Sequence, residues 1–158
     1  MRQLLKQILK IGTMFFQTRS DLMSCIRSKG NRKTEIALMN VFRRRGVKGW
    51  RRHVILPGKP DFSFRSRKVA VFVDGCFWHM CPECYKEPKT NVNFWRAKLQ
   101  KNRERDAKVV GELVERHWTV FRFWEHELAV KGFDRTDGFV ALEVALQFPP
   151  KKCHADLE

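Results

Sequence analysis

The stretch "DGCFWHMCPEC" at residues 74–84 constrains the fold more than any other part of the sequence. It contains Cys76, Cys81 and Cys84 in the spacing C-x4-C-x2-C, while Cys25 and Cys153 stand alone. Clustered thiols in a chain without a secretory signal favour a metal site over a disulfide framework. Because soft thiolates select zinc in a neutral cytosolic protein, the stretch predicts a loop closed by a structural Zn²⁺.

A tetrahedral zinc site needs one more ligand, and two histidines compete for that position. His79 lies inside the loop and is the nearer choice in sequence. His126, at the end of the last predicted strand, would instead tie the loop to the sheet, which is how a structural zinc stabilises a small domain. Spacing alone favours neither histidine.

The charge balance predicts a polyanionic partner. In 158 residues, 32 Lys and Arg face 17 Asp and Glu, a net charge of +15 that is spread along the whole chain. Nucleic acid is favoured over a membrane surface because no long basic amphipathic helix is present, and 5 Trp and 13 Phe can stack on or wedge between bases.

The sequence contains no predicted membrane span, since no apolar run reaches the ~20 residues needed to cross a bilayer. The N-terminal "MRQLLKQILKIGTMFF" is interrupted by lysines and is not followed by a small-residue cleavage site. We therefore expect a cytoplasmic, nucleoid-associated protein.

Hydrophobic periodicity predicts one α/β domain over residues 34–149, with a small central mixed sheet flanked by helices. The predicted helices cover residues 35–46, 93–117 and 136–148, and the predicted strands cover residues 50–56, 61–64, 69–75 and 118–128. Residues 1–33 are interpreted as a basic arm or short helix that contacts DNA through Arg19, Lys29 and Arg32. Residues 150–158 are interpreted as a flexible tail.

Polar side chains interrupt the apolar faces of two predicted helices. On the long helix, Asn102 and Asp106 share a face with Trp95, Leu99 and Val109. A carboxylate on such a face is costly unless it has a partner or a functional role. An ion pair between Asp106 and one of the many arginines explains the pattern as well as a catalytic role does.

Two further acids suggest a second type of metal site. Glu35 lies on the apolar face of the first predicted helix, and Asp61 opens a strand directly after the turn "PGKP". A carboxylate at such a junction suits Mg²⁺, which prefers oxygen ligands and takes one or two carboxylates from the protein. "PGKPD" is also ordinary turn chemistry, so the motif gains weight only from its neighbours.

Four stretches together resemble the very short patch repair (Vsr) endonucleases, which nick DNA at thymine-guanine mismatches. The stretches are "LPGKPDF" at 56–62, "VFVDGCFWH" at 71–79, "NVNFWRAKLQKNRERD" at 91–106 and "WTVFRFWEHEL" at 118–128. The segment at 19–38 is similar to the family's N-terminal arm and first helix. The resemblance implies a restriction-endonuclease-like fold, Mg²⁺-dependent phosphodiester hydrolysis and a structural zinc.

The resemblance also implies roles for individual acids and histidines. Asp61 corresponds to the metal-binding aspartate, and His79 corresponds to the general base. Glu35 and Asp106 correspond to acids that support the site. His126 falls where the family supplies the last zinc ligand beside Cys76, Cys81 and Cys84, which leaves His79 for catalysis.

The same resemblance implies that Phe77, Trp78 and Trp95 wedge into the base stack beside the mismatch. Two positions depart from the best-known member of the family. Val73 stands where that member has a threonine, so it would bind Mg²⁺ through its backbone carbonyl. Asp74 stands where that member has a histidine and would add an acid near the metal.

These observations predict a monomeric endonuclease that nicks one strand of mismatched double-stranded DNA. Mismatch-repair proteins form a further expected class of partner. Two alternatives remain at this stage: a nuclease of a restriction or defence system with another DNA target, and a zinc-stapled DNA-binding module without catalysis.

Overall fold

The computed structural model describes residues 34–148. The predicted arm at 1–33, with its DNA contacts through Arg19, Lys29 and Arg32, lies outside the described residues, as does the predicted tail at 150–158. Within the described range, no helix is long and apolar enough to cross a membrane.

A mixed sheet of three strands forms the centre of the described domain, as predicted. The strands are β1 (Phe62–Phe64), β2 (Val69–Asp74) and β3 (Thr119–Trp124), in the spatial order β1-β2-β3. β2 pairs antiparallel with β1 and parallel with β3. Because β2 is central and covered on both faces, its whole length is buried, which explains its continuous apolar sequence.

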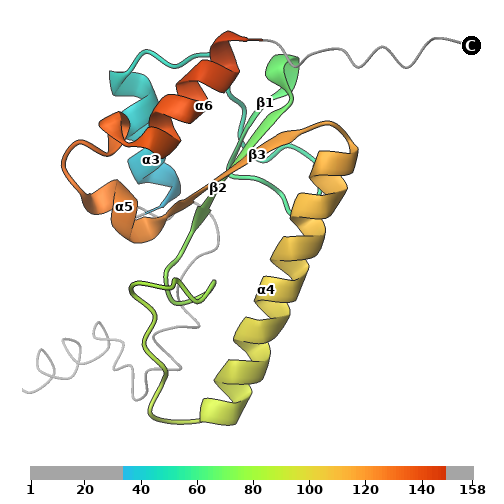
Figure 1. The fold of residues 1–158 in the computed structure, drawn as a ribbon, viewed down its shortest axis with the longest axis vertical. Helices are drawn as coiled ribbons and strands as arrows, with labels where there is room; N and C mark the ends of the chain where they lie inside the picture. Colours follow the sequence, from blue (N-terminus) through green and yellow to red (C-terminus); the bar gives the residue numbers. More distant parts are fainter. Residues whose placement is uncertain (1–33, 149–158) are drawn as a thin grey trace, which may run out of the picture. The chain divides into compact units, whose positions relative to one another are not determined.

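Helices cover the two faces of the sheet (Figure 1). On one side lie α3 (Glu35–Arg44), α5 (Glu125–Ala129) and α6 (Asp137–Gln147). The short 3-10 turn η2 (Phe133–Arg135) lies between α5 and α6, and a second one, η1 (Arg65–Arg67), links β1 to β2. The long helix α4 (Val92–Glu115) runs along the other side. The three predicted helices are confirmed, with ends within two residues of those expected.

The alternation of side chains along β2 divides the core in two. Val69, Val71 and Val73 pack with residues of α3 and α6, while Ala70 and Phe72 pack with Val109 and Leu113 of α4. Asp74 follows in the same alternation as Ala70 and Phe72, so β2 delivers its last residue, an acid, to the side of the sheet that α4 covers.

Glycine ends α3 where the sequence predicts it. Gly46 has a φ of +67°, its N–H donates to the carbonyl of Arg43, and the N–H of Val47 donates to the carbonyl of Phe42. This pair of hydrogen bonds is the Schellman arrangement, which satisfies carbonyls that the helix end leaves free. At the start of α6, the hydroxyl of Thr136 caps the helix by accepting from the N–H of Phe139.

The predicted strand at residues 50–56 is wrong. Only Arg51 pairs with the sheet, in an isolated bridge to Ser63. His53 then takes a φ of +56°, which turns the chain away, and Ile55 is 100% exposed. Trp50 packs against the core, but the left-handed backbone at His53 ends the extended run before a ladder can form.

The last predicted strand, 118–128, is too long. β3 ends at Trp124, and residues 125–129 form α5. The carboxylate of Glu127 accepts a hydrogen bond from the N–H of Trp124 at 2.5 Å, and Glu125 adds a second acid to the first helical turn. Both acids favour a helix start at this point.

Gly58 sets the close approach between the loop that precedes Asp61 and helix α4, and substituting it tests this packing. A Cβ on Gly58 would lie 2.4 Å from Cγ1 of Val109, at a φ of +67°. We expect Gly58→Ala to lower the free energy of unfolding by about 1–3 kcal/mol, measured by urea denaturation. Gly111→Ala, on α4 with nothing within 4 Å of the added carbon, is the control and should raise it by roughly 0.5–1 kcal/mol. Equal stability of Gly58→Ala and the unsubstituted protein would contradict this packing.

Candidate active site and metal centre

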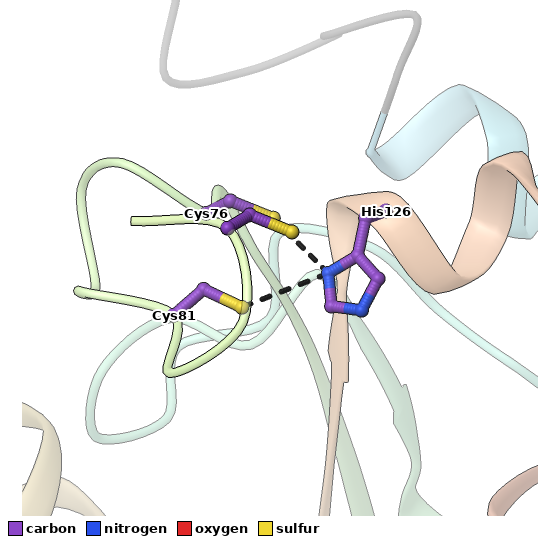
Figure 2. A group of neighbouring side chains, drawn as sticks. Cys76, Cys81 and His126 are labelled. Carbon is purple, nitrogen blue, oxygen red and sulfur yellow. Dashed lines mark hydrogen bonds between the residues drawn. The ribbon is translucent and has the colours of Figure 1, made fainter. Parts of the chain in front are cut away.

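Three cysteines and a histidine form a group that could hold a metal ion. Ligand atoms of Cys76, Cys81, Cys84 and His126 all lie within 4.8 Å of one another. Figure 2 shows the sulfurs of Cys76 and Cys81 facing Nδ1 of His126, at 3.3 and 3.7 Å. His79 does not belong to this group, so the structure brings together the four predicted zinc ligands and leaves the second histidine apart.

Local hydrogen bonds shape the loop around this group. The N–H of Cys81 donates to the carbonyl of Cys76 at 2.9 Å, and the N–H of Tyr85 donates to the carbonyl of Cys81 at 3.0 Å. On the opposite side, α5 begins directly after β3 and thereby places His126 against the loop. The group therefore joins the loop to an element that lies about 40 residues further along the chain.

The surroundings of the group also suit a metal. Nε2 of His126 lies 3.3 Å from the carboxylate of Glu83, the partner that metal-bound histidines commonly have on their second nitrogen. Desolvation by burial raises the pKa of Cys76 to about 12, so its thiolate form needs a cation beside it. Soft sulfur donors with one imidazole are the donor set that zinc favours.

His79 is held by helix α4 rather than by the cysteines. Its Nδ1 lies 2.5 Å from Oδ2 of Asp106, and its backbone N–H donates to the carbonyl of Gly75 at 3.2 Å. The side-chain amide of Asn102 donates to the carbonyl of Trp78 at 3.1 Å. The two polar residues on the apolar face of α4 therefore both bind the loop.

The contact with Asp106 determines the protonation of the imidazole. An ionised carboxylate can only accept, so Nδ1 of His79 carries the proton that it donates. In the neutral ring, Nε2 is then the basic nitrogen. This is the form that a general base at position 79 requires.

A network of charges that the sequence did not reveal surrounds this pair. Arg122 donates to both carboxylate oxygens of Asp74, from Nε at 2.6 Å and from Nη2 at 2.7 Å. Its Nη2 also lies 3.3 Å from Oδ2 of Asp106. Burial opposes the charge on Arg122, but the hydrogen bonds and charges of the two aspartates outweigh it and raise the pKa of Arg122.

Asp61 lies at the start of β1, half-buried, where its Oδ2 accepts a hydrogen bond from the N–H of Val73 at 2.7 Å. Burial, followed by the neighbouring Glu35 and Asp74, raises the pKa of Asp61 to about 7 against the opposing effect of that hydrogen bond. Crowded oxygen donors of this type suit a hard divalent cation. Binding of such a cation by the backbone carbonyl of Val73 stays a prediction.

Glu35 is almost fully buried on α3, with 3% of its surface exposed. It forms an ion pair with Arg52, which lies within the segment 50–56 that was wrongly predicted as a strand. The pair explains how a carboxylate survives on the apolar face of α3.

The predicted wedge residues form one aromatic cluster. The rings of Phe77, Trp78 and Trp95 pack edge to face, with centroids 5.3–6.0 Å apart. Phe77 and Trp78 are half-buried, whereas Trp95 is 7% exposed and lies beneath them. Nζ of Lys98 lies 5.5 Å from the ring centroid of Trp78. Contact of these rings with DNA stays a prediction, and Trp95 supports the other two in this structure.

Sequence reasoning missed Arg122, Arg52 and Glu83. A signal existed for Arg122. It alternates with Trp118 and Val120 along the strand, so its side chain faces the side of the sheet that α4 covers. A charged side chain there needs a partner. For the other two, the partners lie in separate elements whose positions the sequence alone does not give.

Comparison with known proteins adds an independent result. The sequence model of the family described as "DNA mismatch endonuclease Vsr" matches residues 14–86. The type II nicking enzyme V.NmeDIP of Neisseria meningitidis serogroup C is 40% identical over 114 residues, which cover 71% of this chain and 76% of that protein. The DNA mismatch endonuclease Vsr of Escherichia coli strain K12 is 40% identical over 82 residues, 51% of each chain.

The type II nicking enzyme V.NaeI of Lentzea aerocolonigenes is 54% identical over 69 residues, which cover 44% of this chain and 42% of that protein. The chain therefore matches less than half of this relative's length.

The raised pKa of Asp61 predicts a measurable dependence of stability on pH. An unfolded aspartate ionises near pH 4, so between about pH 4 and pH 7 only the unfolded chain gains from losing this proton, and stability falls as pH rises. Without added Mg²⁺ at pH 8, Asp61→Asn should unfold at a higher urea concentration than the unsubstituted protein, a gain on the order of 1 kcal/mol after allowance for partial exposure. Below pH 4 the difference should vanish; a gain that is the same at both pH values would contradict the assignment.

Proposed function

The chain belongs to the Vsr family of DNA endonucleases, and from this premise we propose that it nicks one strand of double-stranded DNA beside a thymine-guanine mismatch, using Mg²⁺. Family membership and the restriction-endonuclease-like fold class, both predicted from the sequence motifs, are confirmed by the family match and the mixed sheet flanked by helices. The observation that carries the proposal is the His79–Asp106 pair, held apart from the cysteine group and on the same side as Asp74.

In the proposed reaction, Nε2 of His79 takes the proton of the attacking water while Asp106 holds the ring and stabilises its charged form. Asp61 would hold Mg²⁺ together with the carbonyl of Val73, and Glu35, paired with Arg52, would support the site from α3. When bound, this cation supplies positive charge beside the scissile phosphate.

We assign Zn²⁺ to Cys76, Cys81, Cys84 and His126 as a structural metal. It would fix the loop so that Phe77 and Trp78 keep their place against DNA. Wedging rings into a base step costs a few kcal/mol of stacking, and this cost is lowest where pairing is already weakened. A wobble mismatch is such a place, so the rings would help to select the target.

A single active site in a monomer accounts for cleavage of one strand only. The +15 net charge fits binding to duplex DNA. A cytoplasmic location at the nucleoid, and cooperation with mismatch-repair proteins, follow from the same proposal.

A second candidate has specific support. V.NaeI and V.NmeDIP are named type II nicking enzymes, and this name does not mention a mismatch. The target would then be a DNA site of a restriction or defence system. A DNA-binding module without catalysis is the weaker alternative, because it gives no role to the His79–Asp106 pair.

The mismatch proposal is tested by incubating the protein and Mg²⁺ with end-labelled duplexes that carry one thymine-guanine pair in varied flanking sequences. We expect one nicked strand at the mismatch and intact, perfectly paired duplexes. Asp61→Ala and His79→Ala should lower the nicking rate by at least about 10²-fold, since each removes a group of the proposed chemistry.

The control is Arg96→Gln, on the exposed side of α4 in an ion pair with Glu87, which should nick normally. Equal cleavage of paired and mismatched duplexes would favour the restriction-linked alternative. Tight binding without any cleaved strand would favour the module without catalysis.

A further inference from the structure

We propose that Arg122 is a positioning residue that determines which carboxylate orients His79. It binds both carboxylate oxygens of Asp74 and thereby leaves Asp106 as the hydrogen-bond partner of the imidazole. The inference rests on the proposed function, because His79 matters for the reaction only if it acts as the base. Under the same inference, Asp74 binds Arg122 and is not a ligand of the divalent cation.

The fold brings these groups together from three elements. Asp74 ends β2 and Arg122 lies on the neighbouring strand β3, while α4 contributes Asp106. In the parallel register, Arg122 lies opposite Phe72, and its guanidinium carbon is 5.2 Å from the centroid of that ring. This cation–π contact with Phe72 helps to hold the guanidinium on the side of the sheet that α4 covers.

Two carboxylates lie within reach of the same imidazole nitrogen. Nδ1 of His79 is 2.5 Å from Oδ2 of Asp106 and 3.8 Å from Oδ1 of Asp74. Either acid could accept the Nδ1 proton after a small movement of the ring. The two acceptors would point the ring in different directions, and so would point Nε2 in different directions.

Arg122 removes this ambiguity. Its two hydrogen bonds to Asp74, at 2.6 and 2.7 Å, occupy both oxygens of that carboxylate in the paired geometry that a guanidinium favours. Its contact with Asp106 is longer, 3.3 Å, and involves Oδ2, the oxygen that also faces His79. Asp74 is thus held in place while Asp106 keeps its short contact with the ring.

The same contacts separate Asp74 from the proposed cation site. Asp74 is 5% exposed, and its charge is balanced by a guanidinium that is itself largely buried. Asp61, which has no arginine partner within the described residues, then remains as the carboxylate that faces a divalent cation.

The test compares Arg122→Lys, Arg122→Met and the control Arg116→Met. The control removes the same positive charge from an exposed arginine outside this network. Two quantities are measured: the single-turnover nicking rate at saturating mismatched duplex, and the imidazole ¹⁵N resonances of His79, assigned with a His79→Gln sample. Arg122→Lys keeps the charge but cannot bind both oxygens of Asp74 in the paired geometry.

We expect Arg122→Lys to lower the single-turnover rate about tenfold and Arg122→Met about a hundredfold, with duplex affinity unchanged, because a displaced base costs rate rather than binding. Both should shift the Nδ1 resonance of His79, while Arg116→Met changes neither quantity. If Arg122→Met fails to fold because Asp74 is left unpaired, Arg122→Lys alone decides the question.

A folded Arg122→Lys protein with the unsubstituted rate and an unshifted Nδ1 resonance would overturn the inference. If the unsubstituted protein nicks no duplex, the proposed function fails instead. The resonance measurement then still tests the role of Arg122, since it requires no cleavage.

Discussion

The closure of the cysteine loop onto His126 is the interaction on which the rest of the site depends. Because His126 faces Cys76 and Cys81 with its Nδ1, the cysteine group is complete without His79. His79, two residues before Cys81 in the chain, can then bind Asp106 on α4. One loop thus contributes three cysteines to the group with His126 and also contributes His79 to the pair with Asp106.

The second constraint is the balance of buried charge. In a strongly basic chain, most acids of the site have a cationic partner: Glu35 pairs with Arg52, and Asp74 pairs with Arg122. For Asp61, burial and acidic neighbours raise the pKa to about 7, which makes its charged form costly. A divalent cation at this position would relieve that cost, which is why the proposed function places Mg²⁺ there.

Periodicity predicted α3, α4, α6 and the three strands of the sheet because each has a face that meets a core. It failed for residues 50–56, where the positive φ of His53 ends the extended backbone, and for residues 125–128, where Glu127 starts a helix. The anomaly of Asp106 was visible in the sequence: the ion-pair explanation is confirmed by its contact with Arg122, whereas its contact with His79 supports the catalytic explanation, which stays a proposal. The Asp74–Arg122 pair joins residues 48 positions apart, and only the strand register reveals it.

X-ray absorption at the zinc edge tests the central claim, that His126 binds the zinc and His79 does not. The account predicts one zinc per chain with three sulfur ligands and one nitrogen ligand. It further predicts that His126→Ala removes the nitrogen contribution, whereas His79→Ala leaves the spectrum unchanged. A spectrum that changes with His79→Ala and not with His126→Ala would show that His79 is the zinc ligand and would contradict the account.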